Sequence, residues 1–417
     1  MNTDHPPRTA DRFAPFGTTI FSEMTALANT HQAVNLSQGF PDFDGPELGK
    51  AAAIRAIQDA DNQYAPMPGV PALRQAIAGW ASRVSNIDCD PDTEITVTNG
   101  CTEAIAATML GLTNPGDEVI IFEPYYDSYR ACLAMSGAKP VFVTLHPSTE
   151  ESSTTDQPGF AYKPTELEAA FSERTKAILI NTPHNPTGAV FTKAQLEAIA
   201  RLCIKHDVIA IADEVYERLT YDDPIHTATH RATHQSIATI EGMGERTVVL
   251  SSAGKSFSLT GWKIGWAIAP PSLTAGIRAA HQFLTFSVAT PLQHGVAALL
   301  NEGEAEIEKL RAHYTHTRAL LGEALHELGF EFQLPQGSYF IMADHTKVSE
   351  RLGLLVDGHP SDIELCRWLP AHAGVAAIPP SAFYSNPQHG RRFVRFAFCK
   401  QTKTIDRAIE RLRAALN

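Results

Sequence analysis

The stretch around residue 255 holds the residues most able to do chemistry. The apolar run 247–250 is followed by two serines, Ala253, Gly254 and Lys255, and a second lysine, Lys263, comes eight residues later. Lysine can form a Schiff base with a carbonyl compound when burial or a cationic neighbour keeps its amine partly neutral. The small neighbours leave room for a flat group at the tip of Lys255, and Lys263 could be both the cationic neighbour and a phosphate partner. The stretch therefore predicts a reactive amine beside an anion site.

The same stretch also matches a motif of another enzyme class. Ser252 to Lys255 fits the S-x-x-K pattern of penicillin-binding enzymes, which also carry S-D-N and K-T-G. Neither string occurs in the chain, so an acyl-enzyme mechanism is not favoured. Most lysines are simply solvated surface residues. A functional role for Lys255 is therefore favoured only by the other features of the sequence, described next.

Apolar, β-branched runs recur along the chain as predicted strands, and several end in polar or aromatic residues. In open α/β sheets, ligands bind at the carboxyl ends of the strands. A carboxylate that ends an apolar strand is semi-buried and needs a cationic or protonated partner, and an aromatic side chain there can stack on a planar ring. The residues that this pattern brings to one edge are Tyr126, Asn185, Asp213, Tyr216 and Lys255.

The turn after the predicted strand 95–98 offers an anion site. Gly100, Cys101 and Thr102 lead into a predicted helix, 104–112. The first N–H groups of a helix lie at the positive end of its dipole and suit a phosphate. An ordinary strand-to-helix turn with Thr102 near the cap explains the same residues, and both interpretations stay open here.

Two further positions suggest contact with a ligand. Arg395 lies in the apolar strand 392–398, where an arginine usually meets a carboxylate through paired hydrogen bonds. A structural salt bridge and a substrate carboxylate explain it equally well. Gly39 ends a short predicted strand and would let the backbone approach a ligand closely.

Three histidines, His226, His230 and His234, are spaced four apart, which on a helix would place them on one face. Neighbouring threonines and a proline disfavour a long helix, and no acidic or cysteine ligand accompanies the spacing. We therefore predict no metal site.

Composition sets the class of protein. The 417 residues suffice for two domains, and 44% of them are hydrophobic. A formal net charge of −12, with acids and bases interspersed, argues against nucleic acid as a partner. The N-terminus has no apolar signal core, and no run approaches the roughly 20 apolar residues of a membrane span, so we expect a cytoplasmic protein. The six cysteines form no C-x-x-C pair, which predicts neither disulfides nor a zinc site.

Alternating strands and helices from about residue 94 predict an α/β protein with two domains. We expect an irregular N-terminal arm, 1–45, that contributes to the small domain. A large domain, 46–288, follows, and then a small C-terminal domain, 289–417, that opens with one long helix, 293–328. Residues 146–160 read as a polar surface loop.

Six strings in a fixed order resemble the fold-type I pyridoxal-phosphate aminotransferases of class I/II. They are NLSQGFPDF, NTPHNPTG, ADEVYERL, SSAGKSFSLTGWKIGW, AIPPSAFYS and FVRFAFCK, and the likeness runs from about Asn35 to the C-terminus. It is greatest for the subgroup of kynurenine aminotransferases and bacterial methionine aminotransferases. This subgroup also carries a lysine at the position that Lys263 occupies here, where many class I relatives have arginine. The resemblance implies a large domain with a mostly parallel seven-stranded sheet between helices, plus a smaller α+β domain.

By this resemblance, Lys255 binds the cofactor, pyridoxal phosphate, as a Schiff base and moves the proton at the substrate's Cα. Asp213 pairs with the pyridine nitrogen and keeps it protonated, so that the ring withdraws electrons. Asn185 and Tyr216 donate to the ring's phenolic oxygen, and Tyr126 stacks on the ring. The implied phosphate cradle consists of Gly100, Cys101, Thr102, Ser252 and Lys263.

The resemblance also implies a clamp on the substrate carboxylate made of Gly39, Asn185 and Arg395. Tyr64 corresponds to a tyrosine that reaches the phosphate from the neighbouring subunit, and Phe286 to an aromatic that the second subunit lends to the substrate pocket. We therefore expect a homodimer with shared active sites.

The expected reaction is transamination, in which an L-amino acid gives its amino group to a 2-oxo acid. Methionine, kynurenine or another large neutral or aromatic amino acid is the expected donor. A C–S lyase that eliminates a thiol from a cysteine conjugate is the alternative enzyme, because it would use the same lysine. A cofactor-binding sensor is disfavoured, since few residues precede Asn35 and both Lys255 and Asp213 are present.

Overall fold

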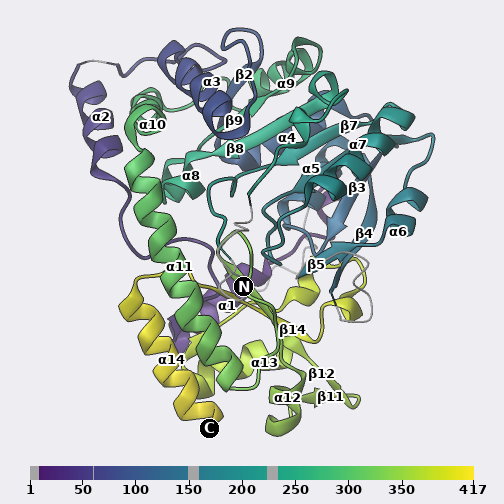
Figure 1. Cartoon of the computed structure of the whole chain (residues 1–417), viewed down its shortest axis with the longest axis vertical. Helices are drawn as coiled ribbons and strands as arrows, with labels where there is room; N and C mark the ends of the chain where they lie inside the picture. The colour runs from purple at the N-terminus through teal and green to yellow at the C-terminus, as the bar shows by residue number, and fades with distance from the viewer. Residues whose placement is uncertain (1–8, 60, 149–158, 223–232) are drawn as a thin grey trace, which may run out of the picture.

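The computed structural model describes residues 9–59, 61–148, 159–222 and 233–417. Its centre is an eight-stranded sheet, in the upper half of Figure 1, with the order β2-β9-β8-β7-β6-β3-β4-β5. Strands β9 and β5 run antiparallel to their neighbours, and the others are parallel. In chain order the strands are β2 (Ile95–Asn99), β3 (Glu118–Glu123), β4 (Lys139–Pro147), β5 (Phe160–Tyr162), β6 (Thr175–Asn181), β7 (Ile209–Asp213), β8 (Thr247–Ser252) and β9 (Ile264–Ile268).

The sheet has one strand more than the seven expected. The additional strand, β5, has three residues and pairs with the end of β4 at the sheet edge. So short a segment carries too little alternation to be seen in the sequence.

The central strands have apolar middle sections that are buried, because helices cover both faces of the sheet. Ile121 and Leu179 pack in a cluster on one face, and their neighbours Ile120 and Ile178 pack in a cluster on the other. The covering helices are α2 (Glu47–Gln58), α3 (Pro71–Ser85), α4 (Gly100–Leu112), α5 (Ser128–Ser136), α6 (Pro164–Ala169), α7 (Lys193–His206), α9 (Pro271–Leu284) and α10 (Thr290–Glu302).

A second part, in the lower half of Figure 1, has its own core. Two short sheets, β1 with β13 and β10 with β14, pack among its helices. The bounds are α1 (Ile20–Thr30), β1 (Val34–Asn35), α11 (Glu304–Glu327), β10 (Phe340–Asp344), α12 (Thr346–Leu352), β11 (Leu355–Val356), β12 (His359–Pro360), α13 (Asp362–Trp368), β13 (Val375–Ala376), β14 (Phe393–Ala397) and α14 (Thr402–Leu416).

Two expectations about these helices were wrong. The helix expected over 293–328 is interrupted at Gly303, where a Cβ would lie 2.5 Å from the carbonyl oxygen of Leu299. The N-terminal arm, expected to be irregular, contains α1, because Pro15 and Gly17 precede the helix instead of interrupting it and the Thr19 side chain caps it.

Helix α11 connects the two parts. Helix α10 packs on α2 and α3 beside the sheet, and α11 continues from it into the lower part of Figure 1. The division at residue 289 stays a prediction.

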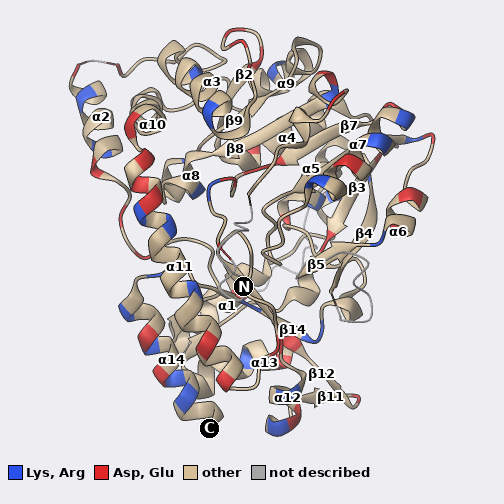
Figure 2. Ribbon diagram, in the orientation of Figure 1, with Lys and Arg blue, Asp and Glu red and all other residues tan. Residues whose placement is uncertain are grey.

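Lys, Arg, Asp and Glu are interspersed along α11 and α14 (Figure 2). Among the described residues, no helix is long and apolar enough to cross a bilayer.

Candidate active site

A cavity of about 170 Å³ lies where the parallel strands end. The strands deliver their last residues, or the turns that follow them, to its wall, so side chains far apart in the chain meet there. The predicted site residues that line it are Gly100, Cys101, Thr102, Tyr126, Asn185, Asp213, Tyr216, Ser252, Lys255 and Lys263.

Lys255 follows β8 on the one-turn helix α8 (Ala253–Ser256). Its Nζ donates to the hydroxyl of Tyr339 at 2.8 Å and lies 3.5 Å from the carbonyl oxygen of Gly39. No described residue forms an ion pair with it, and burial lowers the pKa of its amine. Lys255 is therefore held by neutral groups in a setting that favours the uncharged amine.

Asp213 is the last residue of β7 and is buried. Tyr129 donates to its Oδ2 at 2.6 Å, and the thiol of Cys101 lies 3.8 Å from its Oδ1. Burial raises the pKa of this carboxyl group, and the hydrogen bond from Tyr129 opposes the rise. A cationic group bound in the cavity would relieve the burial cost of the carboxylate.

The start of α4 forms a cradle at one end of the cavity. Gly100 has a φ of +74°, and a Cβ there would lie 3.1 Å from the Nζ of Lys263. A Cβ at Gly265 would lie 2.6 Å from the backbone nitrogen of Cys101, so both glycines keep the backbone open. Helix N–H groups beside a lysine suit a phosphate-sized anion.

Arg395, on β14, is 1% exposed and lies next to the cavity. It donates to Oδ1 of Asn185 at 3.0 Å and to the carbonyl oxygen of Ser37 at 2.9 Å, while its Nε has no partner. No carboxylate of the described residues pairs with it, and burial lowers its pKa to about 10. This cation is available to a ligand carboxylate.

Gly39 packs against the same aromatic ring, Phe340, that Arg395 covers. A Cβ at Gly39 would lie 2.7 Å from the ring of Phe340, whose face the Arg395 guanidinium covers at 4.1 Å. The glycine carbonyl also accepts the hydroxyl of Tyr339. The segment therefore needs a residue without a side chain.

Four predicted residues do not line the cavity of this single chain: Gly39 and Arg395, described above, and also Tyr64 and Phe286. Tyr64 is 85% exposed and Phe286 is 38% exposed, and their rings meet edge to face at 5.6 Å. Neither lines the cavity.

Tyr129 and Tyr339 contact Asp213 and Lys255, but neither was among the residues predicted from the sequence. Tyr129, in the first turn of α5, packs edge to face against Tyr126 just before that helix, and its place three residues after a predicted ring-stacking tyrosine was the one available signal. Tyr339 had no such signal, because the contacts that position it come from segments remote in the chain.

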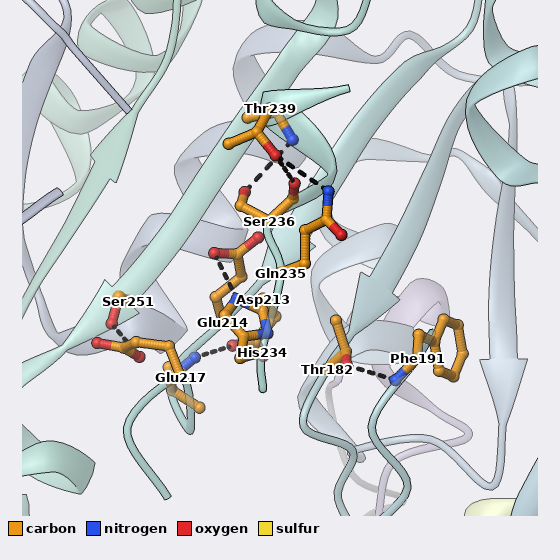
Figure 3. Close-up of polar contacts among 12 residues, drawn as sticks. Thr182, Phe191, Asp213, Glu214, Glu217, His234, Gln235, Ser236, Thr239 and Ser251 are labelled. Carbon is orange, nitrogen blue, oxygen red and sulfur yellow. Dashed lines mark hydrogen bonds and ion pairs between the residues drawn. The ribbon is translucent and has the colours of Figure 1, made fainter. Parts of the chain in front are cut away.

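Of the three histidines spaced four apart, the structure describes only His234. His226 and His230 lie outside the described residues, and His234 contacts Glu214, with 3.0 Å between Nε2 and Oε2 (Figure 3). No cluster of three His, Cys, Asp or Glu side chains in the described ranges is arranged to bind a metal ion.

Comparisons with known proteins agree with this architecture. The family model "Aminotransferase class I and II" matches residues 31–412. A probable N-succinyldiaminopimelate aminotransferase of Mycobacterium tuberculosis is 44% identical over 97% of this chain and 98% of its own length. The methionine aminotransferase of Escherichia coli is 39% identical over 99% of both chains, and kynurenine–oxoglutarate transaminase 3 of Mus musculus is 38% identical over 98% of this chain and 90% of its own.

Solved structures show the same likeness. That of N-succinyldiaminopimelate aminotransferase from Mycobacterium tuberculosis has a TM-score of 0.89, covering 98% of this chain and 100% of that chain. Its sequence is 44% identical. The family match and the identities across nearly the whole length show that this chain belongs to the class I and II aminotransferases, enzymes that use pyridoxal phosphate.

Proposed function

We propose that the cavity binds pyridoxal phosphate at Lys255 and that the enzyme takes the amino group from an L-amino acid with a large neutral or aromatic side chain. The names of the Escherichia coli and mouse relatives support methionine or kynurenine as the donor. One observation carries the assignment of the site. A lysine with a lowered pKa shares a single cavity with a buried aspartate and with the start of a helix.

The residues present fit the cofactor. The open backbone at Gly100 and the amine of Lys263 suit its phosphate, with Cys101, Thr102 and Ser252 completing the cradle. The aromatic side chain of Tyr126 and the carboxylate of Asp213 also line the cavity, and they suit the face and the nitrogen of a pyridine ring.

When bound, pyridoxal phosphate supplies an aldehyde that takes up the amino group and a ring that withdraws electrons. Lys255 would hold the cofactor, and its amine, whose pKa burial lowers, would accept the proton from the donor's Cα. Asp213 would keep a proton at the pyridine nitrogen, and Tyr216 and Asn185 would donate hydrogen bonds to the phenolic oxygen. The donor's carboxylate binds Arg395, helped by Asn185 and by the backbone of Gly39.

We further propose a homodimer in which each subunit lends Tyr64 and Phe286 to the other's site. Their exposed rings support this, as does the neighbouring Phe283, which is also exposed. Clustered exposed apolar side chains mark contact surfaces.

We propose the cytoplasm as the compartment, because all six cysteines are free thiols.

A second donor is also supported. The Mycobacterium tuberculosis relatives are named for N-succinyldiaminopimelate, and one of them is 44% identical to this chain. N-succinyldiaminopimelate carries carboxylates remote from the reacting carbon, unlike methionine or kynurenine. It is therefore one of the amino donors to be added in the test described next.

The test is the visible absorption of the purified enzyme, followed as each donor is added without any oxo acid. We expect a band from the lysine-bound cofactor, its loss with methionine or kynurenine, and one matching oxo acid released per site. Lys255→Ala should remove the band and turnover. Unchanged turnover in that variant would contradict the role of Lys255, and pyruvate with thiol from a cysteine conjugate, but no response to methionine, would favour the lyase.

A further inference from the structure

The segment after β7 presents side chains to two different places. Asp213 and Tyr216 line the active-site cavity, whereas Glu214 and Glu217, 1% and 7% exposed, are buried away from it. Figure 3 shows the two acids, with His234 next to Glu214 and Ser251 next to Glu217. The transamination chemistry described above makes no use of either acid.

Glu217 accepts hydrogen bonds from the segment that carries Lys255. Ser251 donates to its Oε2 at 3.1 Å, and Ser256 donates to its Oε1 at 3.5 Å. These serines stand on the two sides of Lys255 in the chain. The indole N–H of Trp80, on α3, donates to Oε1 at 3.4 Å, and its ring also packs against Phe257.

The β-ladder cannot make this connection. The pairing of β7 with β8 ends at Asp213 and Leu250, and one further backbone bond runs from the Glu214 N–H to the Leu250 carbonyl oxygen at 2.8 Å. Beyond it, no backbone hydrogen bond of the described residues joins residues 215–217 to residues 251–256. Lys255 lies past that end on one side, and Tyr216 lies past it on the other. Glu217 is the acid of the β7 segment that bonds to both flanks of Lys255.

Burying this acid is costly, since burial raises the pKa of Glu217 to about 7, although the nearby His234 opposes the rise. A carboxyl group kept at such a cost, one residue after Tyr216 in the cavity wall, suggests a functional reason for it. Glu214 provides a natural comparison, because it is equally buried in the same segment but pairs with His234 instead of with the Lys255 segment.

We propose that Glu217 is a positioning residue whose carboxylate joins the segment of Lys255 to the segment of Asp213 and Tyr216, and so sets the distance between amine and carboxylate in the cavity. This inference rests on the roles proposed above for Lys255 and Asp213. Misplacing a reacting group by about 1 Å can lower a rate roughly 100-fold.

The experiment compares three variants of the enzyme loaded with pyridoxal phosphate. Glu217→Gln weakens the connection at the acid. The double variant Ser251→Ala/Ser256→Ala removes it from the Lys255 side and leaves the carboxylate of Glu217 in place. Glu214→Gln is the matched control, a buried acid of the same segment without a bond to the Lys255 segment. For each we would measure kcat, the donor KM, the thermal midpoint and the pH midpoint of the cofactor's visible band.

We expect Glu217→Gln and the serine double variant to lower kcat about 10-fold or more without a comparable change in KM. Both should also shift the pH midpoint of the band, which loss of stability alone would not do. Glu214→Gln should lose thermal stability but keep kcat and the band midpoint.

Two results would overturn the inference. One is a serine double variant with the kcat and band midpoint of the unaltered enzyme, which decides the matter even if Glu217→Gln does not fold. The other is a Glu214→Gln variant that loses as much kcat as Glu217→Gln. An unaltered enzyme without a lysine-dependent band would overturn the proposed function itself, and this inference with it.

Discussion

The cavity wall, with Lys255 in it and Arg395 next to it, and the polar layer, meaning the pairs Glu103–His281 and Glu214–His234, differ in how buried charge is compensated. At the wall, neither Lys255 nor Arg395 has an ion-pair partner among the described residues. In the polar layer, His281 contacts Glu103 with 2.7 Å between Nδ1 and Oε1, and Glu214 contacts His234 with 3.0 Å between Oε2 and Nε2. The difference shows which charges the fold satisfies by itself and which it leaves for a ligand.

The physical reason is the cost of removing a charge from water. An isolated buried charge is expensive unless a partner or hydrogen bonds compensate for it. The His281–Glu103 pair fixes the start of α4, because Glu103 also accepts the Asn99 N–H and His281 also contacts the carbonyl of Met67. Such a pair contributes to a rigid frame, whereas the unpaired cations of the wall gain their partners when carboxylate or cofactor binds.

The largest effect should come from breaking a pair in the polar layer. His281→Leu leaves the nearly buried carboxylate of Glu103 without this hydrogen-bonded partner, so we expect a loss of about 3–5 kcal/mol in the free energy of unfolding, measured with urea. His294→Leu is the control, since His294 meets Asp61 at 3.5 Å on the surface and should cost less than about 1 kcal/mol. Equal losses would show that burial does not distinguish the two pairs.

Removing an unpaired cation of the wall should instead affect substrate binding. Arg395→Ala should lower kcat/KM for the amino donor by about 2–5 kcal/mol in transition-state free energy, because the donor carboxylate loses its buried partner. The requirement for cofactor should change much less. Arg392→Ala, three residues earlier and half exposed beside Asp344, should leave kcat/KM unaltered. If it reduced kcat/KM as much, the assignment of Arg395 would be wrong.

The smallest effect should be a gain in stability. Burial lowers the pKa of Lys255 from its usual 10.5, so between the two pKa values the unfolded chain binds more protons than the folded one. In the cofactor-free enzyme, Lys255→Met should therefore raise the free energy of unfolding at pH 7 by about 1 kcal/mol. The gain should shrink as pH rises and vanish above 10.5. Lys309→Met is the control, because Lys309 is exposed and its substitution should bring no comparable gain in stability. A loss of stability in Lys255→Met would contradict the prediction.

Local sequence predicted the frame of the site well. β-Branched runs and the glycine turn after β2 indicated where strands end, and ten of the fourteen residues proposed for the site line one cavity. The contacts of Tyr339 could not be predicted in this way, because its partner Gly39 lies 300 residues away. The break at Gly303 was also hidden, since the periodic pattern continues on both sides of that glycine.

The sequence alone therefore determined the family, the cofactor and the order in which side chains reach the edge of the sheet, because strand periodicity and short motifs are local properties. Only the tertiary structure decided which charges have partners and that Glu217 joins the two segments on which Lys255 and Asp213 stand. Burial and hydrogen-bond partnership depend on residues that are remote in the chain, and no local pattern records them.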